Sequence, residues 1–128
     1  MLVSDAILQI NDLADEGADD SSIINWINDA LADIGREVKA TFPEVTSASD
    51  TLPLENKWCR ILIFPYAAAR NKQKEASQFE YRDLYSQYLT GLQDFSTRYV
   101  VPDAYKDVET EVESDIFTTP PFLWGGNW

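Results

Sequence analysis

An apolar stripe that repeats at the helical period limits most tightly how this chain can fold. Between residues 76 and 99, seven apolar or aromatic side chains recur on what would be one face of an α-helix. They are Tyr81, Leu84, Tyr85, Tyr88, Leu92, Phe95 and Tyr99. A long helix with one apolar face must cover that face with other elements, so the stripe predicts a packed helical body.

A second stripe predicts a helix that opens at Asp20 or Ser21 and ends before Pro43. Its apolar positions are Ile23, Ile27, Ala30, Leu31, Ile34 and Val38. Gly35 lies inside this helix, where glycine costs about 1 kcal/mol relative to alanine. We therefore expect a neighbouring stretch of backbone to approach closely at Gly35.

Two further helices complete the predicted body. One runs from Ser4, as its N-cap, to Gly17, and the other runs from about Leu54 to Gln73 with a kink at Pro65. The inner face expected for the later helix comprises Trp58, Ile61, Leu62, Tyr66 and Ala69. Residues 43–53 are rich in turn formers and predict a loop, with room for a short strand or hairpin.

Four amphipathic helices with short connections predict an all-α fold, an antiparallel bundle over residues 1–102 with a kinked third helix. A chain of 128 residues is one ordinary domain and can bury a sizeable core. The predicted core includes Ile27, Leu31, Ile34, Leu62, Tyr88, Leu92 and Phe95.

Residues 103–128 predict an extended, acidic and aromatic C-terminal arm. Residues 108–113 alternate with period two, as an extended strand would, and the following aromatic tip is interrupted by proline and glycine. Large aromatic side chains are stabilised when another surface covers them, and either a partner or the chain's own bundle could supply that surface. We expect a partner to be bound through Val108, Val112, Phe117, Phe122, Leu123, Trp124 and Trp128.

The net charge of -12 is unevenly spread. Residues 1–53 carry 11 acidic and 2 basic side chains, residues 54–102 carry 5 and 7, and residues 103–128 carry 6 and 1. The net negative charge disfavours binding to nucleic-acid grooves and to anionic membranes. The basic middle section, residues 54–102, suits contact with an acidic flank of another subunit. The side chains expected at that contact are Lys57, Arg60, Arg70, Lys72 and Lys74, with nucleic-acid contact as the alternative.

The residue types favour a non-enzymatic protein without a cofactor. The chain has no histidine, and its single cysteine, Cys59, has the apolar neighbours of a buried, inert thiol. Asp29, Asp33 and Glu37 form a row on one helix flank that could hold a divalent cation, but a solvated or interface stripe is the favoured interpretation. No signal peptide or membrane span is evident in the sequence, so we expect a soluble protein in the cytoplasm.

Several stretches resemble one known family. Residues 27–34, the loop that leads to residues 52–54, residues 66–70 and the aromatic helix that follows are similar to the head-to-tail adaptor (head completion) proteins of tailed bacteriophages. The similarity covers about residues 4–100. It lies in the order and character of the elements.

The resemblance implies a structural neck component of the virion, assembled in the host cytoplasm. Such a protein forms a ring, often of twelve copies, that docks on the portal protein and extends the DNA channel. The ring presents a platform for the stopper or next tail protein, and DNA passes through it without sequence-specific binding. Since basic linings would trap DNA, Asp29, Asp33 and Glu37 are candidates to face the channel.

Two other functions stay open from the sequence. A small acidic regulator or DNA-mimic protein would inhibit a basic partner through its carboxylate rows. A hydrolase-like enzyme with a carboxylate pair is the least favoured. An adaptor would copurify with virions, whereas a mimic would not.

Overall fold

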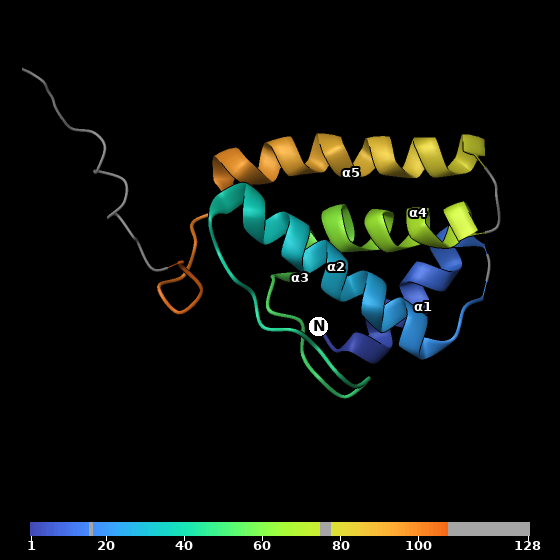
Figure 1. The fold of residues 1–128 in the computed structure, drawn as a ribbon, viewed down its shortest axis with the longest axis horizontal. Helices are drawn as coiled ribbons and strands as arrows, with labels where there is room; N and C mark the ends of the chain where they lie inside the picture. Colours follow the sequence, from blue (N-terminus) through green and yellow to red (C-terminus); the bar gives the residue numbers. More distant parts are fainter. Residues whose placement is uncertain (16, 75–77, 108–128) are drawn as a thin grey trace, which may run out of the picture.

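The computed structural model describes residues 1–15, 17–74 and 78–107, and these residues form an all-α bundle (Figure 1). The elements are α1 (Val3–Ala14), α2 (Asp20–Val38), a continuous helical segment, and α5 (Gln78–Arg98). The segment consists of α3 (Asn56–Trp58), the π-helical turn η1 (Cys59–Ile63) and α4 (Phe64–Lys74). Helix α4 packs against α1, α2 and α5, so it forms the centre of the bundle. The predicted fold class is confirmed.

The two predicted stripes meet in the core. All seven predicted core residues are buried, and Tyr88 and Phe95 are the largest side chains with almost no exposure to solvent. Phe95 packs edge-on against Trp58, with ring centroids 5.0 Å apart, and stacks on Tyr99 at 4.4 Å. Aromatic contacts of this kind add to the hydrophobic term and join α5 to the start of the third segment.

Both ends of α1 differ from the sequence prediction. The helix starts at Val3 rather than after Ser4, and no side chain caps it. Its first N–H groups are satisfied instead by a distant loop, since Val3 donates to the Asp50 carbonyl and Ser4 donates to the Ala48 carbonyl, both at 2.9 Å. At the other end, Asp15 rather than Gly17 takes the left-handed conformation that ends the helix.

The third segment contains a π turn immediately before Pro65. Proline has no N–H to donate to the Ile61 carbonyl, and the Phe64 N–H bonds to the Cys59 carbonyl, five residues back. The extra residue in the turn shifts the register of the helix. Ile61, predicted to be internal, is 38% exposed, although its Cγ2 atom lies close to Gly91 of α5.

The loop over residues 43–53 buries apolar side chains despite its many turn formers. Val45 and Leu52 are each 3% exposed. Asn28 on α2 fixes the loop, because its amide donates to the Val45 carbonyl at 2.8 Å and accepts from the Val45 N–H at 2.9 Å. In the described part of the chain this loop forms no strand or hairpin and makes a single bridge, between Thr51 and Leu2.

The close approach predicted at Gly35 is confirmed. A Cβ atom placed there would overlap the carbonyl oxygen of Ala40 and lie 3.3 Å from its carbonyl carbon. The chain reverses here because Lys39 adopts a positive φ of 58°, after which the Ala40 N–H donates to the Gly35 carbonyl at 2.9 Å. Glycine at position 35 thus lets residues 40–42 fold back along α2.

Candidate interaction site

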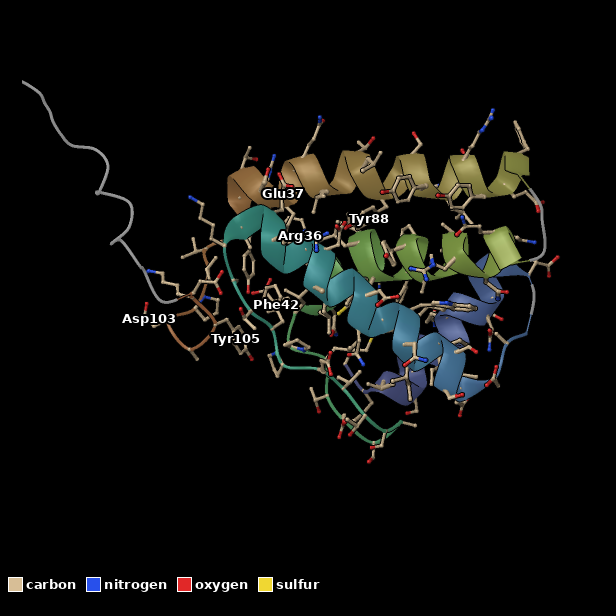
Figure 2. All side chains as sticks on the ribbon, in the orientation of Figure 1. Arg36, Glu37, Phe42, Tyr88, Asp103 and Tyr105 are labelled. Carbon is tan, nitrogen blue, oxygen red and sulfur yellow. The ribbon has the colours of Figure 1, made fainter. Side chains whose placement is uncertain are left out.

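The last described residues are held against the bundle at one place, which we call the arm root (residues 103–107 with residues 39–42). The Thr41 N–H donates to the Tyr105 carbonyl at 2.8 Å, and the Asp107 N–H donates to the Lys39 carbonyl at 3.2 Å. The Tyr105 ring packs edge-on against Phe42 at 5.4 Å (Figure 2). Residues 103–107, which follow the boundary predicted after residue 102, therefore contact the helical bundle.

A groove of about 600 Å³ lies next to the arm root. Asn28, Ala32 and Arg36, on successive turns of α2, form one wall, and residues 40–44 form the other. Asp107 lies at its edge and accepts a hydrogen bond from the Thr41 hydroxyl at 2.6 Å. Asp107, the last described residue, is therefore held beside this groove.

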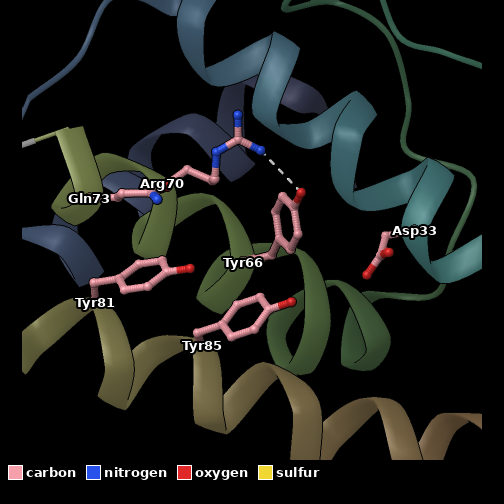
Figure 3. Close-up of a pocket in the computed structure, with 6 residues that line it drawn as sticks. All are labelled: Asp33, Tyr66, Arg70, Gln73, Tyr81 and Tyr85. Atoms are coloured by element: carbon pink, nitrogen blue, oxygen red, sulfur yellow. Dashed lines mark hydrogen bonds between the residues drawn. The ribbon is translucent and has the colours of Figure 1, made fainter. Parts of the chain in front are cut away.

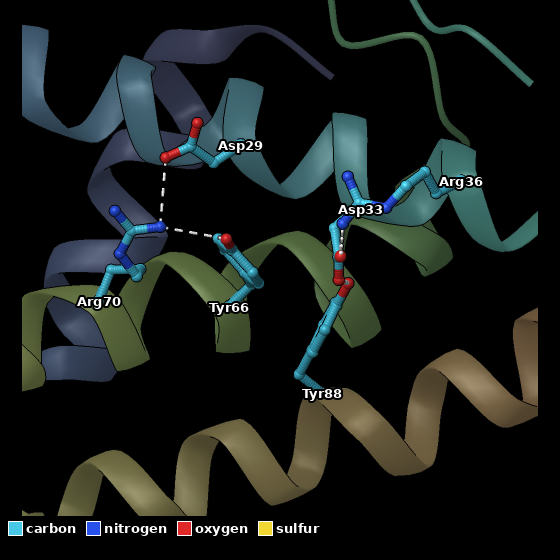
Figure 4. A network of polar contacts seen from close by, with 6 residues as sticks. All are labelled: Asp29, Asp33, Arg36, Tyr66, Arg70 and Tyr88. Atoms are coloured by element: carbon cyan, nitrogen blue, oxygen red, sulfur yellow. Dashed lines mark hydrogen bonds and ion pairs between the residues drawn. The ribbon is translucent and has the colours of Figure 1, made fainter.

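Two carboxylates of the acidic row on α2 (Asp29, Asp33 and Glu37) contact other side chains within the molecule (Figure 4). Asp29 pairs with Arg70 of α4 at 3.2 Å, and Asp33 pairs with Arg36 and accepts a hydrogen bond from the buried Tyr88 hydroxyl. Glu37 is exposed. Of the three candidate channel residues, Asp29 and Glu37 present carboxylates to solvent, whereas Asp33 is turned toward α5.

Burial raises the pKa of the Tyr88 hydroxyl well above its ordinary value, and its hydrogen bond to the Asp33 carboxylate acts in the same direction. Burial also raises the pKa of the Cys59 thiol to about 11. Cys59 is fully buried, and its Sγ lies 3.5 Å from the Leu54 carbonyl oxygen. Both groups stay protonated at neutral pH, which agrees with the inert thiol expected from the sequence.

A tyrosine cleft of about 260 Å³ opens between α2, α4 and α5 (Figure 3). It is lined by Asp33, Tyr66, Arg70, Gln73, Tyr81 and Tyr85. The Arg70 guanidinium donates to the Tyr66 hydroxyl at 3.1 Å and lies 5.8 Å from the Tyr66 ring centroid. This single side chain therefore joins the tyrosine cleft to Asp29.

The sequence did not reveal this cleft. Tyr81 and Tyr85 were assigned to the inner face of their helix, yet each is only half-buried. The spacing of Tyr66 and Arg70, four residues apart on one helix, was the signal that could have indicated it.

The predicted inter-subunit cations lie in different surroundings. Lys57 and Arg60 are exposed, and Lys57 lies over the Trp58 ring, 5.0 Å from its centroid. Lys72 is mostly buried and pairs with Glu80 at 3.2 Å. With Arg70 paired to Asp29, Lys57 and Arg60 are the two cations best placed to meet another molecule. The side chain of Lys74 lies outside the described residues.

The predicted arm residues also lie outside the described part of the chain: Val108, Val112, Phe117, Phe122, Leu123, Trp124 and Trp128. Over the ranges that are described, no three histidine, cysteine, aspartate or glutamate side chains gather in a way that could hold a metal ion. No helix within the same ranges is both long enough and apolar enough to cross a bilayer.

Comparison of the chain with protein-family models, with curated proteins and with solved structures found no significant match.

Proposed function

We propose that this protein is a structural neck component of a tailed bacteriophage, a head-to-tail adaptor that acts without a cofactor. In this proposal twelve copies form a ring in the host cytoplasm that docks on the portal protein and becomes part of the virion. The ring extends the DNA channel and carries the stopper or next tail protein. The resemblance in the sequence motivates the proposal.

The arm root is the observation that carries this proposal. A ring component must present its partner-binding segment at the same position in every copy. Backbone hydrogen bonds from Thr41 and Asp107, with the packing of Tyr105 on Phe42, fix the point from which residues 108–128 begin. Trp124 and Trp128 can then act as anchors on the portal, since buried aromatic residues dominate the binding energy of interfaces.

Contacts between copies are proposed to join opposite charges. Lys57 and Arg60 project from the start of the third segment, and Asp12 and Asp20 are exposed on α1 and α2. Pairing these surfaces would offset the repulsion between subunits that each carry a net charge of -12. The exposed carboxylates of Asp29 and Glu37 are our candidates for the channel wall.

The DNA-mimic alternative receives less support from the geometry. A mimic needs carboxylates that are free to meet a basic partner. Asp33 is held by Arg36 and Tyr88 and is turned toward α5, and the exposed carboxylate of Asp29 is shared with Arg70, so the row presents fewer free acids than the sequence suggests.

The proposal is tested by cosedimentation with portal rings of the phage that encodes the chain. The full chain should sediment with the portal, and the Trp124→Ser/Trp128→Ser double variant should lose most of this binding. A Phe79→Ser variant, which removes an aromatic side chain that is 84% exposed at the start of α5, is the matched control. Full retention of portal binding by the double variant would show that the aromatic tip is not the dock. Failure of the unaltered chain to sediment with the portal would contradict the adaptor function itself.

A further inference from the structure

The tyrosine cleft is organised before anything binds to it. The rings of Tyr81 and Tyr85 stack at 5.8 Å, Tyr85 lies 5.7 Å from Tyr88, and Tyr88 packs edge-on against Tyr66 at 5.0 Å. Arg70 holds the Tyr66 hydroxyl at the cleft's other side. Because ring contacts and a hydrogen bond hold these side chains, little conformational entropy would be lost when a ligand enters.

The chemistry of the cleft suits a polyproline segment. Polyproline II helices have no internal hydrogen bonds, and they dock in grooves lined by aromatic rings. The hydroxyls of Tyr81 and Tyr85 form no hydrogen bond with any residue in the described ranges, so each can donate to a peptide carbonyl. Gln73, an exposed amide at the rim, supplies a further donor.

The chain itself contains one matching segment. Its six prolines include a single adjacent pair, Pro120 and Pro121, with Thr119 before the pair and Phe122 after it. The stretch that precedes this pair carries Glu109, Glu111, Glu113 and Asp115. Arg82 is exposed one residue after Tyr81, so it offers a cation near the cleft that can attract this acidic stretch.

The positions of the cleft and the arm root permit docking between copies. Tyr81 lies in the first turn of α5, whereas the arm root follows the other end of α5, about 25 Å away along the helix. Figures 1 and 2 show the root and the start of α5 at opposite ends of the bundle. A segment that leaves one end of each copy and enters the other end of the next makes a head-to-tail contact, which closes into a ring when the rotation permits.

We propose that the tyrosine cleft of one copy binds residues 119–122 of a second copy in polyproline II conformation. The inference rests on the proposed ring, and it gives that ring a subunit-to-subunit strap separate from the portal dock at Trp124 and Trp128. The 12 residues from 108 to 119 span at most roughly 40 Å, so they can bridge adjacent subunits.

Two full-length variants test the strap by complementation. Pro120→Ala/Pro121→Ala removes the strap and keeps the cleft, whereas Tyr81→Ala/Tyr85→Ala removes the cleft and keeps the strap. Sedimentation velocity should show weakened self-association for each variant alone, and one-to-one heterodimers when the two are mixed. A mixture that remains monomeric would overturn docking of the segment in the cleft. An unaltered chain that stays monomeric at concentrations where the mixture dimerises would overturn docking between copies, because the segment then folds onto its own cleft. Unaltered self-association of the proline variant would overturn the role of the proline pair.

A peptide probe keeps the test decisive if self-association is weak or a variant misfolds. The peptide Thr-Thr-Pro-Pro-Phe-Leu-Trp, titrated to about 1 mM into the full-length proline variant, should shift the ring resonances of Tyr66, Tyr81 and Tyr85. Introducing Tyr81→Phe/Tyr85→Phe into the proline variant keeps the rings and removes the hydroxyls, and it should weaken peptide binding about tenfold. Adding Tyr99→Phe, outside the cleft, should leave it unchanged.

Absence of any shift, or equal binding by all the protein variants, would contradict the proposal. No portal is present in these measurements. Failure of the strap is therefore distinguishable from failure of the adaptor function, which is measured by portal binding.

Discussion

Replacing Gly35 by alanine should destabilise the bundle and loosen the arm root. Alanine would gain about 1 kcal/mol in helix propensity. Its Cβ would overlap the backbone carbonyl oxygen of Ala40, at a separation well below 3.0 Å, and would lie 3.6 Å from the Phe42 ring. Overpacking of this kind costs about 1 to 3 kcal/mol. Weakening the Ala40 to Gly35 hydrogen bond, 2.9 Å long, costs about 1 kcal/mol more.

The expected net loss in the free energy of unfolding is therefore about 1 to 3 kcal/mol, or a fall in Tm of about 4 °C for each kcal/mol. Thermal unfolding followed by far-ultraviolet circular dichroism measures this loss. Hydrogen exchange at the Thr41 and Asp107 amides should also speed up, because residues 39–42 carry the arm root.

Gly17→Ala is the matched control. No atom lies within 4 Å of the position where its Cβ would be, and its φ is not positive. This substitution should be neutral or stabilising by about 0.4 to 1 kcal/mol, because alanine restricts the unfolded chain. If Gly35→Ala proves as stable as Gly17→Ala, the close approach at Gly35 is not a constraint and the reasoning fails.

Three further perturbations test the core and its buried polar groups. Leu92→Ala should cost about 2 to 5 kcal/mol in chemical denaturation, and a loss below about 0.5 kcal/mol would show that the stripe on α5 is misplaced. Tyr88→Phe removes the hydroxyl that donates to the Asp33 carboxylate and should cost about 1.5 to 3 kcal/mol, whereas the Tyr99→Phe control should cost less. Because the folded protein raises the pKa of Cys59 from 9.0 to about 11, the stability due to the neutral thiol is complete below pH 9 and is lost as the pH rises toward 11. Urea titrations at rising pH should therefore show that the free energy of unfolding falls less steeply with pH for Cys59→Ala than for the unaltered chain. An identical dependence of the free energy of unfolding on pH would contradict the burial of this thiol.

The helices and their buried faces could be predicted because periodicity reports directly which side of a helix is apolar. The stripes on α2 and α5 were correct, and so was the role of Gly35. The start of α1 could not be predicted, since the groups that satisfy its first N–H groups are the Ala48 and Asp50 carbonyls, far away in the sequence. The π turn before Pro65 was missed for a similar reason, because a local sequence shows that a bond is lost but not how the helix compensates.

The candidate site was harder to predict than the fold. The sequence identified Asp29 and Arg70 separately, but only the packing of α2 on α4 brings them into an ion pair. The tyrosine cleft arises because Tyr81 and Tyr85 reach past the edge of the core, which periodicity alone cannot distinguish from full burial. The arm root depends on Tyr105 returning to Phe42, 63 positions earlier in the sequence. Long-range contacts of this kind leave no local pattern.

The most direct test of the adaptor proposal is negative-stain imaging of the full chain mixed with portal rings of the same phage. The proposal predicts an added ring of density on one face of the portal, coaxial with its channel, and no such ring with the Trp124→Ser/Trp128→Ser variant. Portal particles that stay bare at saturating concentrations of the unaltered protein would contradict it.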